Sequence, residues 1–174
     1  MRIIIVVFFL LVCPSIWCQE YVYAHNYLVK VGEKAPEFTA QLQDGSLFKL
    51  HEQRGKIVML QFTASWCVVC RKEMPYIEKD IWLPLQHKDF VLIGVDYKEN
   101  MTTTKKFANQ MNTTYPMAVD STGDIFHLYA QKGAGVTRNV IINKEGYIIH
   151  LTRLFNLTEF NHMKEVIFKS VNKD

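Results

Sequence analysis

Residues 58–75 read VMLQFTASWCVVCRKEMP, and this stretch decides how the rest of the chain is interpreted. An apolar run ends at Phe62, a short turn of small residues follows, and Cys67 and Cys70 then open a segment with a helical pattern. Two cysteines separated by two residues at a helix N-terminus can close as a disulfide, or open as a dithiol whose first sulfur faces the positive end of the helix. We therefore interpret the motif as a redox site.

A metal site is the main alternative for this cysteine spacing. Structural zinc needs two further Cys or His ligands, whereas the chain has four cysteines, no second pair at this spacing, and six scattered histidines. We therefore predict no metal site. A copper(I) carrier stays open as an alternative function, because two thiolates with a nearby His, Met59 or Met74 would suit this soft ion.

The segment FTASWCVVCRKEMP (residues 62–75) resembles the active-site stretch of the TlpA/ResA-like family of exported thiol-disulfide oxidoreductases, which have a thioredoxin fold. The resemblance continues upstream through VGEKAPEFTAQLQDGSLFKLHEQRGKIVMLQF (residues 31–62), with its GxxAPxF element and Asp-Gly hairpin. It covers about residues 30 to 171. It implies one thioredoxin-like domain at residues 30–172 that needs no cofactor.

The order of apolar patterns along the chain predicts an α/β fold without help from the family. Short apolar or alternating runs predict strands at 38–41, 47–50, 57–62, 90–95, 140–142 and 147–151. Helical spacing predicts helices from residue 69 and at 102–111, 124–130 and 157–171, with 115–118 as an extended link. We expect a thioredoxin-like three-layer sandwich with a mixed central sheet, helices on both faces and an N-terminal β-hairpin extension.

The N-terminus has the pattern of a secretory signal. Arg2 is followed by ten apolar residues, 3–12, a run too short to span a bilayer comfortably. We predict a signal peptide at 1–18, cleaved after Cys18, and an exported or periplasmic protein. Cleavage after Ala24, an uncleaved anchor, and a lipoprotein modified at Cys18 or Cys13 are the alternatives.

The charge of the chain limits the kinds of partner that it can bind. The formal net charge is +3 and the basic residues are scattered rather than clustered, so no nucleic-acid partner is indicated. The family resemblance implies protein disulfides or dithiols as substrates and a membrane thiol donor. We expect the protein to act as a monomer.

The two cysteines are expected to have different roles. Cys67 is predicted to be the attacking thiol, because helix N-termini favour thiolates, and Cys70, one turn further on, is predicted to resolve the mixed disulfide. Trp66 either shapes a substrate platform or covers the edge of the core. Val68 and Val69 add no charge and no proline, which favours a reductase of envelope protein disulfides over a strong oxidant.

Glu73 is the candidate residue for proton transfer at the cysteines. It follows Cys70 by three residues and so shares its helix face. In the resembled family the matching acid lies in a cavity beside the disulfide, where it accepts a proton or raises the thiol pKa. The alternative is a surface glutamate paired with Arg71 or Lys72. Gln61, where many thioredoxins have a buried aspartate, cannot titrate.

Residues 135–143, GVTRNVIIN, contain a departure from the family pattern. Thr137 falls where the family has a cis-proline facing the cysteines, and we take Val136 and Thr137 as substrate-binding candidates. We predict a cis Val136–Thr137 bond, because a trans bond would shift the loop facing Cys67. Peroxiredoxins also lack this proline, so a thiol peroxidase is an alternative. A peroxiredoxin-like site, however, has a threonine three residues before its reactive cysteine, and the residue at that position here is Ala64.

Overall fold

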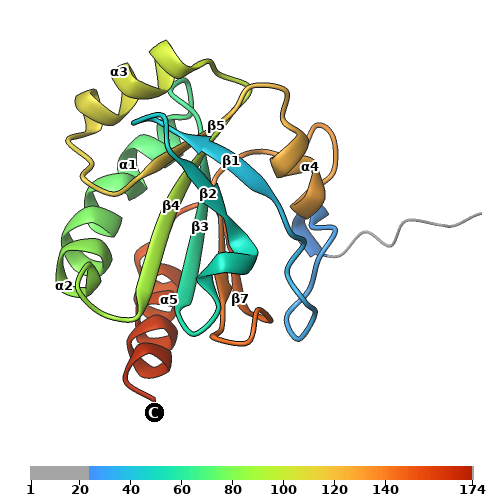
Figure 1. Ribbon diagram of the computed structural model, residues 1–174, viewed down its shortest axis with the longest axis vertical. Coiled ribbons are helices and arrows are strands. Elements are labelled where there is room, and N and C mark those ends of the chain that lie inside the picture. Colours follow the sequence, from blue (N-terminus) through green and yellow to red (C-terminus); the bar gives the residue numbers. More distant parts are fainter. Residues whose placement is uncertain (1–23, 174) are drawn as a thin grey trace, which may run out of the picture.

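The computed structural model describes residues 24–173 (Figure 1). The predicted signal peptide, residues 1–18, lies outside the described residues. Tyr27 is already buried and bridges Ala130, so packing begins shortly before the predicted domain start at residue 30. No helix among residues 24–173 is long and apolar enough to cross a membrane.

A mixed sheet forms the centre of the described part of the chain (Figure 1). Its strands are β1 (Thr39–Leu42), β2 (Leu47–Lys49), β3 (Ile57–Thr63), β4 (Phe90–Tyr97), β5 (Met117–Asp120), β6 (Arg138–Ile142) and β7 (Ile148–Arg153). Their spatial order is β2-β1-β5-β4-β3-β6-β7. Strands β3, β4 and β5 run parallel, and the other neighbours pair antiparallel. The predicted N-terminal hairpin therefore extends the central sheet, because β1 pairs with β5.

Strand β5 corrects the prediction of an extended link at 115–118. Proline weakens the sequence signal of a strand because it cannot donate to a ladder. Here Pro116 stands just before the strand, and its carbonyl still accepts the Gly94 N–H at 3.0 Å. The short run therefore pairs with β4 on one side and β1 on the other.

Helices cover both faces of the sheet, as predicted. The helical elements are η1 (Ala24–Asn26), η2 (Leu50–Gln53), α1 (Val68–Ile77), the π-helical turn η3 (Glu78–Trp82), α2 (Leu83–Leu85), α3 (Met101–Met111), α4 (Asp124–Tyr129) and α5 (Leu157–Val171). Helices α1, α3 and α5 share one hydrophobic core with the sheet, and α4 belongs to the other. This arrangement is the predicted three-layer sandwich.

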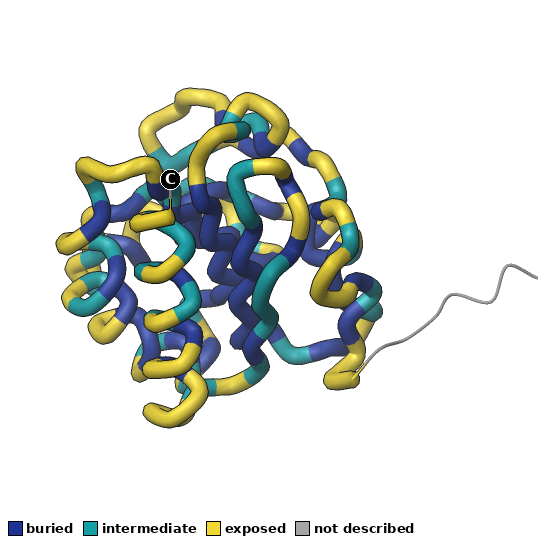
Figure 2. The backbone as a smooth tube through the Cα atoms, turned by 90° about the horizontal axis from the view of Figure 1, so that it is seen from below, coloured by how far each residue is buried: buried dark blue, intermediate teal, exposed yellow. Residues whose placement is uncertain are grey.

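Strand β3 lies between the two hydrophobic cores, and all seven of its residues are buried. Val58, Leu60 and Phe62 face the core that includes α4, whereas Ile57 and Met59 face the core of α1, α3 and α5. Figure 2 shows the strands as a buried centre surrounded by helices with exposed outer turns. A strand buried on both sides is rigid, and it fixes the position of whatever follows its end.

Candidate redox site

The end of β3 and the start of α1 position the two cysteines. Cys67 is the N-cap of α1, and its Sγ accepts the Cys70 N–H at 3.1 Å. The two sulfurs form a disulfide. Cys67 is 8% exposed and Cys70 is fully buried. Cys67 therefore lies nearer to solvent, at the helix end where unpaired N–H groups favour negative charge.

Thr137, on the loop before β6, faces this disulfide. Its Oγ1 lies 3.2 Å from the Cys67 Sγ and 3.3 Å from the Cys70 Sγ. Its carbonyl accepts the Leu154 N–H at 3.0 Å, which ties the loop to the end of β7. The structure thus brings Thr137 to both cysteines, although the sequence placed it there by alignment alone.

The predicted cis peptide bond at Val136–Thr137 is wrong. This bond is trans, and no cis peptide bond occurs among residues 24–173. A cis bond before a non-proline residue costs about 2.5 to 4 kcal/mol, and here a trans loop already brings the threonine hydroxyl to the sulfurs. The Val136 side chain is buried in the core, so any contact of this residue with a substrate would use its main chain.

Proline at position 137 should therefore impair this protein. Thr137→Pro removes the hydroxyl that contacts both sulfurs and, where the new proline adopts the cis form, also moves the loop that Leu154 anchors. We expect a lower melting temperature and a several-fold loss of disulfide exchange, measured by thermal unfolding and by insulin reduction. A Thr137→Pro variant that is more stable and fully active would contradict this account of the loop.

Glu73 lies inside the protein, so the alternative of a surface ion pair with Arg71 or Lys72 is wrong. The residue is 2% exposed, and Asn139 Nδ2 donates to its Oε1 at 2.7 Å. Burial raises the pKa of Glu73 from 4.5 to about 7, while the side chains of Asn139 and Gln61 oppose the rise. A carboxyl group with this pKa exchanges its proton near neutral pH.

Asn139 is a site residue that the sequence analysis missed. It lies directly opposite Gln61 in the β3–β6 ladder, and it also donates to Thr152 Oγ1 at 2.9 Å. Gln61 is fully buried and accepts the Tyr115 hydroxyl at 2.7 Å. The available signal was a polar residue two positions after Thr137, which in extended backbone points to the same side as Thr137.

The turn before Cys67 is fixed by two charged side chains. The N–H and hydroxyl of Ser65 donate to the Glu99 carboxylate at 2.7 and 2.6 Å. Arg71 Nε donates to the Ser65 carbonyl at 2.6 Å. Trp66, held by this turn, is 61% exposed. Its ring is therefore open to a partner and does not cover the edge of the core.

A second buried acid, also missed, lies beside this turn. Asp96 pairs with Thr63 in the β3–β4 ladder and accepts the Thr104 hydroxyl at 2.7 Å. Burial, together with the nearby Glu99 carboxylate, raises the pKa of Asp96 to about 8. Its position at the end of the apolar run 90–95 was visible in the sequence, but its burial was not.

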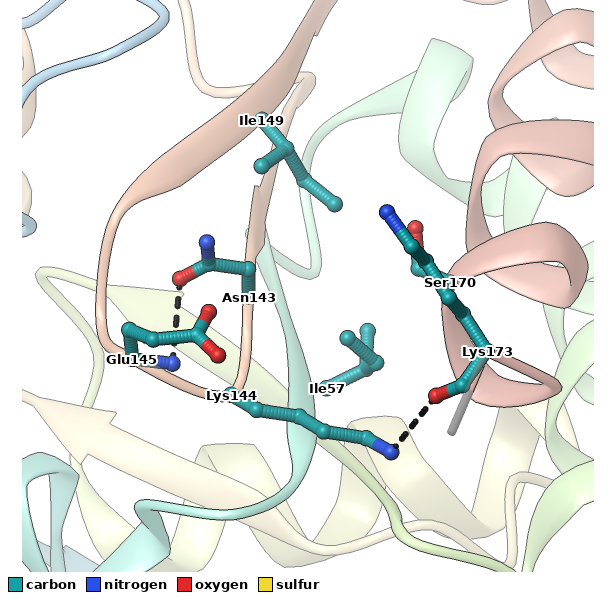
Figure 3. A pocket seen from close by; sticks show the side chains of 7 residues that line it. All are labelled: Ile57, Asn143, Lys144, Glu145, Ile149, Ser170 and Lys173. Atoms are coloured by element: carbon teal, nitrogen blue, oxygen red, sulfur yellow. Dashed lines mark hydrogen bonds between the residues drawn. The ribbon is translucent and has the colours of Figure 1, made fainter.

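The other end of β3 carries a pocket of about 310 Å³ (Figure 3). Its lining comes from the start of β3, the β6–β7 turn, strand β7, and the last turn of α5 with the residues after it: Ile57, Asn143, Lys144, Glu145, Ile149, Ser170 and Lys173. No cysteine lines it, so it takes no part in the disulfide chemistry. Among residues 24–173, no group of three or more His, Cys, Asp or Glu side chains is placed to hold a metal ion.

The fold and the site together define a class: thioredoxin-fold proteins that carry a dithiol–disulfide pair at a helix N-terminus. Residues 31–151 match the model of the AhpC/TSA family. A thiol-disulfide oxidoreductase ResA from Bacillus thuringiensis (strain Al Hakam) is 30% identical over 128 residues, which cover 73% of this chain and 72% of that protein. The family match shows that the chain belongs to the AhpC/TSA family. The relative shows that it also belongs to the ResA-like thiol-disulfide oxidoreductases, as predicted.

Solved structures also share this fold, and two of them illustrate the similarity to this chain. The solution structure of a proposed protein disulfide isomerase from Bacteroides thetaiotaomicron is 50% identical and superposes with a TM-score of 0.83, covering 85% of this chain and 94% of that chain. The crystal structure of a proposed thiol:disulfide interchange protein DsbE from Chlorobium tepidum has a TM-score of 0.74 at 24% identity, with 83% and 99% coverage. The second likeness bears on the fold alone.

Proposed function

We propose that this protein reduces disulfides of exported proteins, with Cys67 as the attacking sulfur. The observation that carries the proposal is the asymmetry of the pair: Cys67 caps α1 and keeps 8% of its surface exposed, whereas Cys70 is fully buried. A substrate can reach Cys67 and cannot reach Cys70. The exposed side chains of Trp66 and Val68 flank Cys67 and offer an apolar contact to the substrate.

The reaction proceeds in two exchanges. The Cys67 thiolate attacks one sulfur of the substrate disulfide, forming a mixed disulfide, and the other substrate sulfur leaves as a thiolate that takes a proton. The Cys70 thiol then loses its proton and attacks the Cys67 sulfur, which releases the second substrate thiolate and closes the Cys67–Cys70 disulfide. Two electrons pass from the protein to the substrate.

Glu73 is the proposed acceptor of the Cys70 proton. It lies one helical turn beyond Cys70 on the same side of α1, and its pKa of about 7 leaves it partly ionised at neutral pH. An ionised Glu73 can take the proton, and a protonated Glu73 can return it when the disulfide is reduced again.

Two features of the sequence support the proposed direction and location of the reaction. The residues between the cysteines, Val68 and Val69, supply no charge or proline that would favour a strong oxidant. The apolar N-terminal run of the sequence supports export, and re-reduction would then require a thiol donor at the membrane. Cell fractionation with N-terminal sequencing of the mature chain tests this part of the proposal.

A thiol peroxidase gains little support from the site geometry. The threonine nearest before the cysteines, Thr63, donates its hydroxyl to Met74 Sδ at 3.7 Å and is fully buried. It therefore does not reach out toward a peroxide at Cys67. The copper(I) alternative needs Met59, Met74 or a nearby His beside the two thiolates. Both methionines are fully buried, and among residues 24–173 no His, Asp or Glu side chain joins the two cysteines in a group placed to hold a metal ion.

Parallel assays on the wild-type protein separate these functions. We expect catalysed reduction of insulin with dithiothreitol as the electron source, because the accessible Cys67 can exchange with protein disulfides. We expect no comparable consumption of hydrogen peroxide with the same reductant, and no stoichiometric retention of copper(I) after gel filtration. Peroxide turnover faster than insulin reduction would reassign the site to a peroxidase, and tight copper retention without insulin reduction would make it a carrier.

A further inference from the structure

The Thr137 hydroxyl lies beside both redox sulfurs, 3.2 Å from the Cys67 Sγ and 3.3 Å from the Cys70 Sγ. Sulfur atoms joined in a disulfide carry no hydrogen, so in the oxidised protein the hydroxyl must be the donor in either contact. A hydroxyl has one proton, and it can donate to one sulfur at a time. The Thr137 hydroxyl can therefore donate a hydrogen bond to either sulfur, but to only one of them at a time.

The hydroxyl is held in this position from several sides. Thr137 is 3% exposed, and its β-branched side chain has few rotamers. Its carbonyl accepts the Leu154 N–H at 3.0 Å, and Arg153 Nη1 donates to the same carbonyl at 3.4 Å. A donor that is already in place costs no reorganisation when charge appears on sulfur.

We infer that Thr137 is a further catalytic group of the disulfide exchange, whose hydroxyl stabilises the negative charge on Cys67 during attack and on Cys70 during resolution. This inference rests on the proposed function and specifies which group accompanies the charge. While Cys67 is the thiolate, it receives the Thr137 O–H and the Cys70 N–H. When Cys67 is bonded to substrate and Cys70 loses its proton, the same O–H turns to Cys70.

The energetic reason is the difference between sulfur acceptors. A thiolate is charged, and hydrogen bonds to ionised acceptors are roughly twice as strong as neutral ones. A disulfide sulfur is a weak, neutral acceptor. Losing the hydroxyl therefore harms the reduced protein more than the oxidised protein, and the disulfide becomes harder to reduce.

The test compares Thr137→Val, which keeps the shape and removes the hydroxyl, with Thr137→Ser, which keeps the hydroxyl. In the Cys70→Ser background, Thr137→Val should move the pH midpoint of Cys67 alkylation by iodoacetamide to higher pH. In the protein with both cysteines, the equilibrium constant with glutathione should shift about tenfold toward the Cys67–Cys70 disulfide. This shift corresponds to a redox potential that is about 30 mV more negative. Thr137→Ser should stay near the wild type in both measurements.

Two outcomes overturn the inference. Suppose that Thr137→Val changes neither the pH midpoint of Cys67 alkylation in the Cys70→Ser background nor the redox potential of the protein with both cysteines. The hydroxyl then does not stabilise the thiolate. If Thr137→Ser changes as much as Thr137→Val, the effect comes from packing. If Thr137→Val does not fold, Thr137→Ala takes its place in the same comparison. Neither measurement needs a protein substrate, so a wild type that fails to reduce insulin refutes the proposed function without deciding the role of Thr137.

Discussion

Replacing Cys67 with serine should abolish insulin reduction, leaving only the rate of the uncatalysed reaction with dithiothreitol. Cys67 is the more exposed of the two cysteines and the cap of α1, and a serine hydroxyl is not a nucleophile for disulfides at neutral pH. Cys70 cannot substitute for it, because Cys70 is fully buried. Turbidity of reduced insulin, followed over time, measures the loss.

Cys70→Ser is the matched control for this variant. Both substitutions remove one sulfur and open the same disulfide, so any general loss of stability is shared between them. Cys70→Ser keeps the attacking Cys67 and should accumulate substrate as a mixed disulfide, visible as a mass increase that dithiothreitol reverses. If Cys70→Ser cycles at the wild-type rate without added thiol, or if Cys67→Ser is the variant that traps substrate, the assigned roles are wrong.

Local patterns predicted much of the fold because each element carries its own signal. The helix at 157–171 is marked by its apolar spacing, and its observed cap is Asn156, whose side chain accepts the Glu159 N–H at 2.9 Å. Strand β3 is marked by a continuous apolar run, since both of its faces are buried. Strand β5 has only four residues behind a proline, and its place between β1 and β4 depends on pairings far away in the sequence.

The candidate site was predictable where its residues are neighbours in sequence. Cys67 and Cys70 are close on the chain, and the helix end explains their different exposure. Glu73 was placed on the correct face of α1, but the hydrogen bond to its buried carboxylate comes from Asn139, 66 residues away. Because a sequence does not show which distant side chains meet, it left open whether Glu73 was buried. The backbone at Thr137 was predicted wrongly because the prediction assumed that a trans bond would shift the loop facing Cys67, whereas the trans loop brings the Thr137 hydroxyl to both sulfurs.

The fold should lose stability as pH rises because Glu73 is buried. Its folded pKa of about 7 lies above its ordinary value of 4.5, so the folded protein keeps a proton that the unfolded chain releases in this range. Stability from this group is complete below about pH 4.5 and is lost as pH rises toward and through 7. Between pH 4 and pH 8 the loss is of the order of 3 kcal/mol.

Glu73→Gln removes this titration, so the variant should be more stable than the wild type at pH 8 and similar to it at pH 4. Urea unfolding of the two oxidised proteins across this range measures the difference while the closed disulfide keeps the cysteines from titrating. Asp96, whose pKa is raised to about 8, contributes equally to the stability curves of the wild type and of Glu73→Gln. Its contribution is therefore removed when one curve is subtracted from the other. Glu145→Gln removes the same charge from an exposed turn and should leave the wild-type curve unchanged. A wild-type minus Glu73→Gln difference that stays constant with pH would mean that Glu73 keeps an ordinary pKa, and it could not then serve as the proton acceptor for Cys70 near neutral pH.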